Sequence, residues 1–261
     1  MRAKKSLGQN FLYNDETLST IVKYAGISEN DIVLEIGPGT GNLTSKLLEK
    51  KPKHLVVVEK DKNLANLLNK KFGKSIDIIN DDILECYKDF DFNIPIKVFG
   101  NLPYNISTKI LTSFIKLNNL KRKYDKFVLI FQKEVADRIV AEENSKYYGR
   151  LSIIVSWKMK KLKIIDIDPK FFFPKPKVWS SLLILTPKNQ FENLKNPKSL
   201  EHITNIFFNH KRKMIKRPMK QLFENFDEIA KKLDLDLNLR PQNISINKYL
   251  EICKIYENLT Q

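Results

Sequence analysis

The sequence has few cysteines, few histidines and a shortage of acidic residues, and each of these limits what the protein can be. Its two cysteines, Cys86 and Cys253, lie far apart without a neighbouring histidine, so we expect neither a disulfide framework nor a metal site. No apolar run approaches the ~18 residues of a membrane span, and the N-terminus lacks the apolar core of a signal peptide. We therefore expect a soluble protein that works in the cytoplasm.

Positive charge is in large excess. The chain has 46 Lys and Arg residues against 30 Asp and Glu residues, a formal net charge of +16 and a sequence pI near 9.6. Between Lys158 and Lys220 alone there are 16 basic residues and 4 acidic ones. A charge of this size favours an anionic partner, with nucleic acid ahead of an anionic membrane surface.

From residue 31 onward, short β-branched runs alternate with longer segments of helical periodicity. This alternation is typical of βα units that build a parallel sheet, and it predicts an α/β fold. The predicted strands are Ile32–Ile36, Leu55–Val58, Ile76–Ile79, Ile96–Phe99, Phe127–Phe131, Ile153–Trp157 and Leu182–Leu185. The spacing of leucine and isoleucine predicts helices at Leu43–Leu48, Leu64–Leu68 and Ile110–Ile115, and Asn14 is in position to cap a further helix.

The strand signal stops after about Thr186. A polar connection follows, and the remaining segments Leu200–Asn209, Met214–Phe226 and Ile246–Leu259 have helical periodicity only. We predict one domain over residues 1–186 and a small helical domain over residues 187–261. The second domain contains a cluster of basic residues: Lys211, Arg212, Lys213, Lys216 and Arg217. The alternative is a charged helix that is merely exposed to solvent, but we expect these residues to contact the phosphate backbone of a nucleic acid.

A glycine-rich loop, Glu35–Asn42, follows the first predicted strand and precedes a helix. Glycine lets the backbone turn sharply there and lets a ligand approach closely. Glu59, at the end of the next strand, lies where a carboxylate can bind both hydroxyls of a ribose. These features also fit NAD, but the loop lacks the third glycine of the G-x-G-x-x-G pattern. A nucleoside without phosphates, such as S-adenosylmethionine, therefore fits better.

The third predicted strand ends at Asn80–Ile83. An acidic side chain at this place can accept a hydrogen bond from an adenine amine, and Ile83 can pack against the ring. Because the carboxyl ends of parallel strands share one edge of the sheet, we expect the glycine loop, Glu59 and these residues to form one site.

The fourth predicted strand ends in Gly100–Tyr104, at the same edge. Methyl transfer to the exocyclic amine of a base is difficult because the nitrogen lone pair is delocalised into the ring. The side-chain oxygen of Asn101 and the carbonyl of Leu102 can hold the hydrogens of the amine and turn its lone pair toward a methyl donor. Pro103 fixes the backbone, and Tyr104 offers a flat face to a base that has left its stack.

These residues resemble a known family. Asn101–Tyr104 is similar to the Asn/Asp-Pro-Pro-Tyr motif of amino-methyltransferases, in the leucine variant of the rRNA adenine dimethyltransferases. Segments along nearly the whole chain resemble, in order, the KsgA/RsmA family of small-subunit rRNA adenine N6,N6-dimethyltransferases: Lys4–Leu12, Glu35–Gly41, Gly100–Thr108, Gln132–Ala136, Tyr148–Ser152, Phe172–Val178, Phe208–Lys213 and Arg240–Ser245. The resemblance implies a Rossmann-like class I methyltransferase sheet with helices on both faces, followed by an all-helical C-terminal domain.

The resemblance also implies roles for single residues. The cofactor-binding positions are Gln9, Asn10, Leu12, Gly37, Gly39, Glu59, Lys60, Asp82, Ile83 and Asn101. The catalytic positions are Asn101, Leu102, Pro103, Tyr104 and Phe172. Phe172 corresponds to the family's base-stacking phenylalanine by its spacing from Pro174 and Pro176, although phenylalanines flank it on both sides. Trp179 is a departure, because relatives often have a small or acidic residue there.

The function implied by the resemblance is the transfer of methyl groups from S-adenosyl-L-methionine to two adjacent adenosines near the 3′ end of small-subunit rRNA. The by-product is S-adenosyl-L-homocysteine, and the expected partners are the small ribosomal subunit and its rRNA, bound by a monomer that needs neither metal nor membrane. Two alternatives remain. One is an Erm-type methyltransferase of large-subunit rRNA, which the leucine of Asn101–Tyr104 argues against. The other is a non-catalytic factor for ribosome assembly or mitochondrial transcription, which the intact site argues against.

Overall fold

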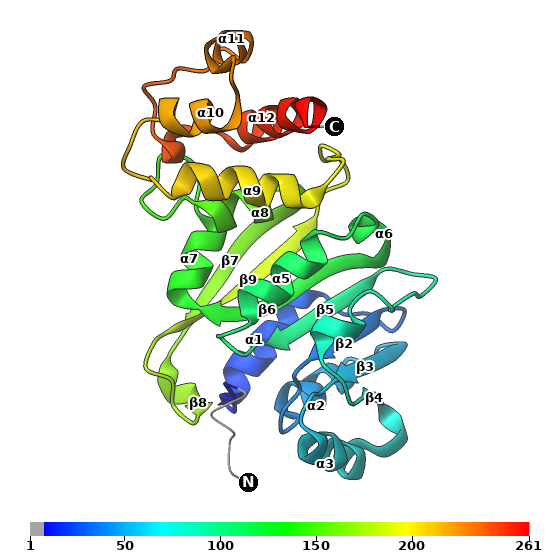
Figure 1. Ribbon diagram of the computed structural model, residues 1–261. Helices are drawn as coiled ribbons and strands as arrows, with labels where there is room; N and C mark the ends of the chain where they lie inside the picture. The colour runs from blue at the N-terminus through cyan, green and yellow to red at the C-terminus, as the bar shows by residue number, and fades with distance from the viewer. Residues whose placement is uncertain (1–7, 261) are drawn as a thin grey trace. The chain divides into compact units, whose positions relative to one another are not determined.

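The computed structural model describes residues 8–260, and the opening motif residues Lys4–Leu7 lie outside this range (Figure 1). The chain forms two compact units. The first consists of the chain up to Ala136 together with Lys160–Lys188, and the second of Asp137–Met159 together with the chain from Asn189 onward.

The first unit is built on a seven-stranded sheet in the order β4-β3-β2-β5-β6-β9-β7. Its strands are β2 (Ile32–Ile36), β3 (His54–Val58), β4 (Asp77–Ile79), β5 (Ile96–Asn101), β6 (Tyr124–Gln132), β7 (Met159–Ile167) and β9 (Ser180–Pro187). Neighbours from β4 to β6 are parallel, whereas β9 runs antiparallel to β6. The chain order reverses between β2 and β5, and at such a switch point the strand ends leave a crevice in which ligands bind.

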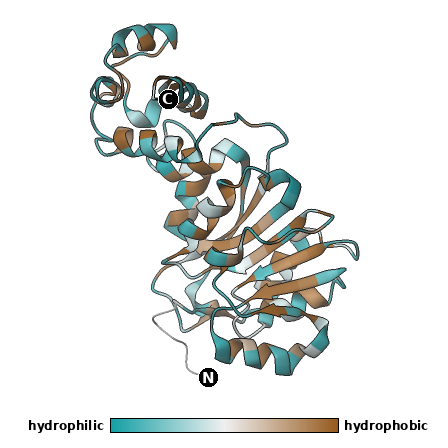
Figure 2. Cartoon of the chain, turned by 45° about the vertical axis from the view of Figure 1, so that its right-hand side comes forward, coloured by the Kyte–Doolittle hydropathy of each residue, from teal (hydrophilic) through white to brown (hydrophobic). Residues whose placement is uncertain are grey.

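Helices cover both faces of this sheet (Figure 1). They are α1 (Asp15–Ala25), α2 (Asn42–Leu48), α3 (Lys62–Phe72), α4 (Ile83–Cys86), α5 (Ser107–Ile115) and α6 (Leu120–Lys123), and α7 (Lys133–Val140) follows β6. Successive strand residues point to opposite faces. Val128 of β6 therefore belongs to the same buried cluster as Ile21 of α1, while Phe127 meets Phe114 of α5 with ring centroids 5.3 Å apart. Figure 2 shows the resulting hydrophobic strands between helices of mixed hydropathy.

A separate two-stranded sheet joins β1 (Phe11–Leu12) to β8 (Phe172–Phe173). The strands are antiparallel, with Phe11 opposite Phe173 and Leu12 opposite Phe172. This pairing holds the segment before α1 beside the segment before β9. The cap expected from the sequence follows directly, because the Asn14 side chain accepts a hydrogen bond from the Thr17 backbone N–H at 2.8 Å.

The second unit is helical. It contains α8 (Arg150–Lys158), α9 (Pro197–Phe208), α10 (Lys216–Leu222), α11 (Phe226–Lys232) and α12 (Ile246–Leu259). Helix α9 packs against both α8 and α12, and Phe207 of α9 meets Tyr249 of α12 edge to face, with centroids 5.3 Å apart. The Tyr249 hydroxyl donates to the Pro241 carbonyl at 2.8 Å, which fixes the Arg240–Ser245 motif onto α12.

One strand prediction is wrong, and three strands escaped prediction: the short pair β1 and β8, and β7 in the seven-stranded sheet. Ile153–Trp157 belongs to helix α8, in which every side chain from Ser152 to Lys158 is buried, so the helix has no polar face to reveal its period. The next segment, Met159–Ile167, forms the edge strand β7, whose several lysines resemble a solvated charge run. The domain boundary expected near residue 186 lies close to Lys188, but Asp137–Met159 also groups with the C-terminal helices.

No helix within residues 8–260 combines the length and the apolar character that crossing a membrane requires.

Candidate active site

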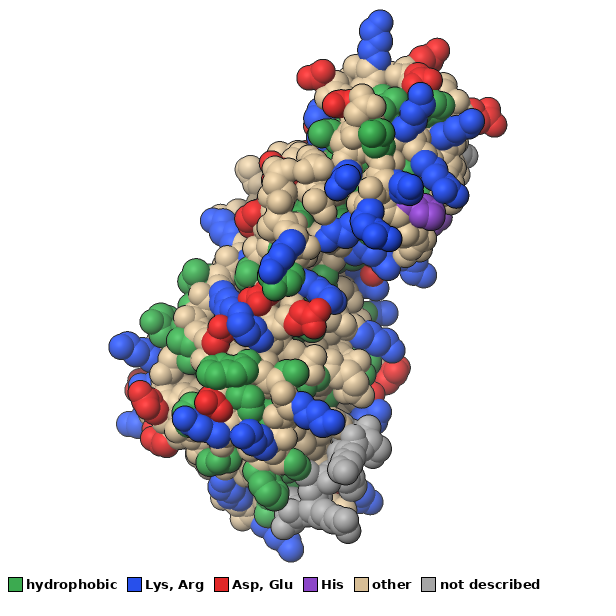
Figure 3. Space-filling view, turned by 90° about the vertical axis from the view of Figure 1, so that its left-hand side faces the viewer, with side chains coloured by type: hydrophobic (Ala, Val, Ile, Leu, Met, Phe, Trp, Pro, Cys, Tyr) green, Lys and Arg blue, Asp and Glu red, His purple; other side chains and the backbone are tan. Residues whose placement is uncertain are grey.

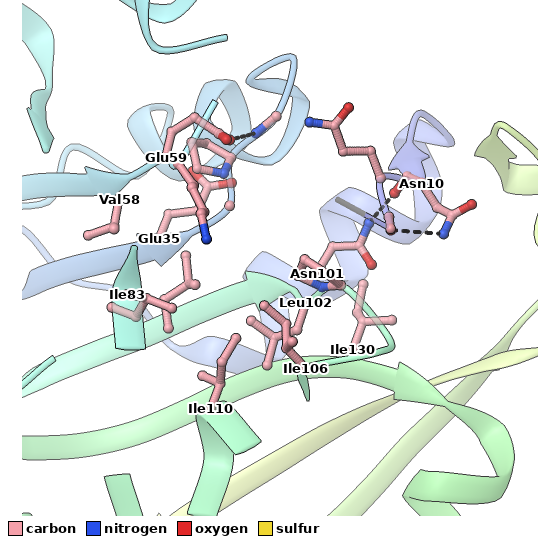
Figure 4. A pocket seen from close by; sticks show the side chains of 18 of the residues that line it. Asn10, Glu35, Val58, Glu59, Ile83, Asn101, Leu102, Ile106, Ile110 and Ile130 are labelled. Carbon is pink, nitrogen blue, oxygen red and sulfur yellow. Dashed lines mark hydrogen bonds between the residues drawn. The ribbon is translucent and has the colours of Figure 1, made fainter. Parts of the chain in front are cut away.

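A cavity of about 340 Å³ lies at the carboxyl ends of β2, β3 and β5, in the size range of small-ligand sites (Figure 4). Almost all site residues predicted for the first unit line it: Gln9, Asn10, Leu12, Gly37, Gly39, Glu59, Lys60, Asp82, Ile83, Asn101, Leu102, Pro103 and Tyr104. The exception is Phe172. The topology thus brings together residues that are separated by up to ninety-odd positions in the chain.

The glycine loop leaves room for a ligand. Gly37 and Gly39 have φ angles of 65° and 59°, which side chains disfavour. A Cβ on Gly39 would lie 2.7 Å from the ring of Phe11, whereas a Cβ on Gly37 would meet no atom within 4 Å. Glycine at position 39 therefore allows β1 to approach the loop, and glycine at position 37 keeps open space in the cavity wall.

Glu59 is held by the backbone around it. One carboxylate oxygen accepts the Gly39 N–H at 3.2 Å and the other accepts the Asp61 N–H at 2.8 Å. Burial raises the pKa of Glu59, while these backbone donors oppose the shift. The carboxylate thus connects the end of β3 to the glycine loop (Figure 4).

Asp82 caps α4 and pairs with Lys60. Its Oδ1 accepts the Leu84 N–H at 2.9 Å, and its Oδ2 lies 2.8 Å from the Lys60 ammonium. Burial opposes ionisation, but the Lys60 ammonium and the Leu84 N–H together hold the pKa of Asp82 below its usual range. Asp82 is therefore a fixed, charged acceptor at the cavity wall, and the buried Ile83 lies next to it.

Asn101 connects the strand ends to the N-terminal segment. Its side-chain nitrogen donates to the Asn10 carbonyl at 2.6 Å, which leaves the side-chain oxygen available as an acceptor (Figure 4). Among residues 8–260, no hydrogen bond to the Leu102 carbonyl occurs either. Two acceptors on adjacent residues thus remain for a ligand, as a site for an amine requires.

Asn42, at the start of α2, was not predicted as a site residue. Its side-chain nitrogen donates to the Leu12 carbonyl at 2.8 Å, so the segment from Asn10 to Leu12 is held from two sides. The only signal in the sequence is its place as the last residue of the glycine-rich loop Glu35–Asn42.

Tyr104 is fixed by a residue from β9, which lies two strands away from β5 in the sheet. Its hydroxyl lies 2.5 Å from the Ser180 Oγ at the start of β9, and burial raises the pKa of the phenol, which stays protonated. Nothing in the sequence links these two residues, because 76 positions separate them.

Phe172 does not line the cavity. Its side chain is 2% exposed and packs into the hydrophobic core with Leu12, whereas its neighbour Phe173 is 62% exposed. Contact between Phe172 and a base therefore requires the side chain to leave this packing, and its assignment as a base-stacking residue stays a prediction.

Glu35 is a further group that the sequence analysis did not assign. Its side chain lines the cavity, is 1% exposed, and accepts a hydrogen bond from the Thr44 hydroxyl at 2.6 Å. Burial raises the pKa of Glu35 to about 8, against a single opposing hydrogen bond from Thr44. Burial therefore favours the neutral form of this carboxyl.

The predicted basic cluster lies in the second unit, between α9 and α10 and in the first turn of α10. Arg212, Lys213, Lys216 and Arg217 are exposed. The Lys211 ammonium instead donates to two backbone carbonyls, those of Lys146 and Tyr148, at 2.8 and 3.2 Å. Lys211 therefore has a structural role that the sequence did not indicate.

A sheet that is parallel from β4 to β6 with β9 antiparallel, and a cavity at its switch point lined by the glycine loop and Asn101–Tyr104, are the features of a class I methyltransferase. The family model described as "Ribosomal RNA adenine dimethylase" matches residues 1–258. The chain belongs to this family and is a methyltransferase.

Two relatives show the similarity at the level of sequence. The chain is 54% identical to "Ribosomal RNA small subunit methyltransferase A" of Pelagibacter ubique (strain HTCC1062), over 99% of this chain and 98% of the relative. It is 40% identical to the protein of the same name from Ehrlichia ruminantium (strain Gardel), over 95% of each chain.

Two solved structures show the similarity of fold. A dimethyladenosine transferase from Plasmodium falciparum aligns with a TM-score of 0.76 at 25% identity, over 95% of this chain and 98% of that one. The 23S rRNA methyltransferase ErmE aligns with a TM-score of 0.71 at 20% identity, over 96% and 100% of the two chains. The second similarity concerns the fold alone. Together these matches confirm the α/β methyltransferase fold predicted from the sequence.

Proposed function

We propose that this enzyme uses S-adenosyl-L-methionine to convert two adjacent adenosines near the 3′ end of small-subunit rRNA into N6,N6-dimethyladenosine. The observation that carries the proposal is the hydrogen bonding of the Asn101 side-chain amide. Its nitrogen is occupied by the Asn10 carbonyl and its oxygen is left to accept, beside the free carbonyl of Leu102. The relatives named for the small ribosomal subunit support the choice of substrate.

The cavity fits the proposed cofactor. The open space at Gly37 admits a ligand against the backbone, Glu59 supplies a carboxylate for the ribose hydroxyls, and Asp82 with Ile83 suits an adenine. When bound, S-adenosyl-L-methionine supplies an electrophilic methyl group and leaves as S-adenosyl-L-homocysteine. Gln9, Asn10 and Leu12 would close the cavity, held by Asn42 and Asn101.

The residues at the end of β5 and directly after it would orient the adenine amine. The Asn101 oxygen and the Leu102 carbonyl accept the two hydrogens of the adenine amine and stabilise the positive charge that develops on nitrogen during transfer. Tyr104, held by Ser180, offers its ring to an adenine that has left its stack. Loss of the proton to solvent follows methylation, so these residues orient the amine without acting as a base.

The helical unit would hold the RNA. We propose that residues 187–261 bind rRNA through Arg212, Lys213, Lys216 and Arg217, while residues 1–186 carry the methyltransferase site. The exposure of these four side chains supports the assignment. We propose further that the enzyme is a monomer, needs no metal ion and works in the cytoplasm, where bacterial ribosomal subunits are assembled.

The test is incubation of the enzyme with labelled S-adenosyl-L-methionine and with ribosomal subunits from cells that lack the modification. We expect label in dimethyladenosine of the small subunit and none in the large subunit. Label in the large subunit would indicate an Erm-type activity. Absence of label from both subunits would indicate a non-catalytic role, and either result would overturn the proposal.

A further inference from the structure

We infer that the loop from Phe173 to Trp179 is a platform on which unstacked nucleotides of single-stranded RNA bind beside the methylation site. The inference rests on the proposed function, because it supplies a contact for the RNA that flanks the target adenosine. The loop, here called the 173–179 loop, has the sequence FPKPKVW and connects β8 to β9.

Both ends of the loop are attached to residues that line the cavity. At one end, β8 pairs with β1, whose residues Phe11 and Leu12 both line it. At the other end, Ser180 directly follows Trp179 and its Oγ contacts the Tyr104 hydroxyl at 2.5 Å. The 173–179 loop therefore lies at the rim of the site, within reach of the nucleotides on either side of a base stacked on Tyr104.

The loop exposes large apolar side chains where its neighbours are buried. Phe173, Val178 and Trp179 are 62%, 43% and 48% exposed, while the flanking Phe172 and Ser180 are 2% and 0% exposed. Residues directly opposite each other in an antiparallel pair point to the same face of the sheet, so Phe173 lies on the same face as Phe11. Phe11 in turn packs against the glycine loop. Three large apolar side chains are thus exposed within seven consecutive residues, and exposed apolar side chains that gather in one place are a feature of interaction sites.

Charge selects RNA as the partner of this surface. Lys175 and Lys177 are exposed, and neither forms an ion pair with any residue from 8 to 260. No acidic residue occurs between Asp168 and Glu192. Figure 3 looks onto the side on which β8 lies in Figure 1, where hydrophobic side chains lie among basic and some acidic ones. Aromatic rings for bases and lysines for phosphates are the two components of single-stranded nucleic-acid sites.

The experiment uses a short oligouridylate, without cofactor. Uridine has no adenine amine, so binding is measured apart from methyl transfer. We expect Trp179→Ala and Phe173→Ala each to weaken oligouridylate binding on the order of tenfold, the effect of losing one stacked base. Trp179→Phe, which keeps a ring, should retain most of the affinity. Tryptophan emission should be quenched by RNA in the parent and not in Trp179→Phe, because Trp157 is buried.

Tyr24→Ala is the matched control. Tyr24 lies on α1 and is 50% exposed. The end of α1 lies at the edge of the sheet opposite the cavity, because Lys126, near the start of β6, donates a hydrogen bond to the Ala25 carbonyl at 2.9 Å. This variant should bind oligouridylate like the parent. Circular dichroism of all variants establishes that each is folded.

The inference is overturned if Trp179→Ala and Phe173→Ala bind oligouridylate as tightly as Tyr24→Ala does. It is also overturned if Trp179 emission responds to phosphatidylglycerol vesicles but not to RNA, which would indicate a membrane surface. The two proposals can fail separately. If the small subunits stay unlabelled but oligouridylate binding still depends on Trp179, the proposed methylation is wrong and the RNA-binding role of the 173–179 loop stands.

Discussion

The side-chain nitrogen of Asn101 donates a hydrogen bond to the backbone carbonyl of Asn10 at 2.6 Å, across 91 positions of the chain. The bond joins the end of β5 to the segment from Asn10 to Leu12, which lines the cavity. It also orients the amide, because a nitrogen committed to one carbonyl leaves the oxygen of the same amide to accept from a ligand. One interaction therefore positions the N-terminal segment and leaves free the oxygen that we propose as an acceptor for the target amine.

Replacement of Asn101 by Ala should abolish most methylation while small-subunit binding stays nearly unchanged. Loss of an acceptor that stabilises charge in the transition state lowers the rate on the order of 10²- to 10³-fold. Single-turnover transfer from labelled cofactor and filter binding of subunits measure the two quantities. Asn63→Ala, at an exposed position of α3, is the control and should change neither. A parallel loss of subunit binding would show that Asn101 is an RNA contact instead.

Ser180 should act on catalysis only through Tyr104. Ser180→Ala and Tyr104→Phe each remove one partner of the same hydrogen bond, whose net contribution is about 1 kcal/mol, so each should lower kcat/KM roughly fivefold. The double variant should be no worse than either single one, because the bond can be lost only once. Steady-state kinetics of the four proteins test this. Additive losses would mean that the two side chains act independently.

Stability should fall as the pH rises, because of Glu35. Burial raises the pKa of Glu35 in the folded chain to about 8, from an ordinary value of 4.5. Between these values the folded state binds one more proton than the unfolded state, so a contribution present at low pH is lost as the pH rises toward 8. One pKa unit corresponds to about 1.4 kcal/mol, so the change amounts to a few kcal/mol.

Glu35→Gln is neutral at every pH and can still accept the Thr44 hydrogen bond, so its free energy of unfolding should depend less on pH than that of the parent. Urea unfolding at about pH 5 and about pH 8 measures the difference. Glu49→Gln, which changes an exposed carboxylate, should keep the slope of the parent. An unchanged slope in Glu35→Gln would show that Glu35 is ionised in the folded protein.

The two neighbouring phenylalanines of β8 should respond differently to truncation. Phe172→Ala empties a core position and should lower the free energy of unfolding by about 3–5 kcal/mol. Phe173→Ala, at an exposed position, should change it by less than about 0.5 kcal/mol. Phe172→Leu keeps most of the packing but has no ring, so it tests stacking of the side chain on a base separately from the stability of the core. We expect it to slow methyl transfer about tenfold, and methylation at the parental rate would remove Phe172 from the catalytic residues.

In the helical unit, charge reversal at Arg217 should weaken RNA binding and reduce its dependence on salt. Each phosphate contact contributes about 0.9 to the slope of log K against log salt concentration. Lys211→Ala should instead cost about 1 kcal/mol of stability, since its ammonium binds the carbonyls of Lys146 and Tyr148. Titrations at several salt concentrations and thermal unfolding separate the effects. If Lys211→Ala lowers the salt dependence of RNA binding as much as Arg217→Glu does, Lys211 contacts phosphate and its proposed structural role is wrong.

Most of the parallel sheet could be predicted from local sequence. The β-branched runs at β2 and β3 are each followed by a helix with clear leucine periodicity, so the two signals agree. Prediction failed where burial removed the signal, as in α8, and where an edge strand carries many lysines, as in β7. In both places the tertiary surroundings decide the structure, because a helix buried on all sides needs no polar face and an edge strand tolerates charge.

The family, the glycine loop, the acidic strand ends and the Asn101–Tyr104 motif could all be read from the sequence, because short runs of residues with the types that the chemistry requires carry them. Which side chains meet depends on the tertiary structure. It placed Asn10 and Asn101 in one hydrogen bond, joined Tyr104 to Ser180, buried Phe172 and exposed Phe173. These outcomes depend on strand order and register, which bring distant residues together and which no local pattern encodes.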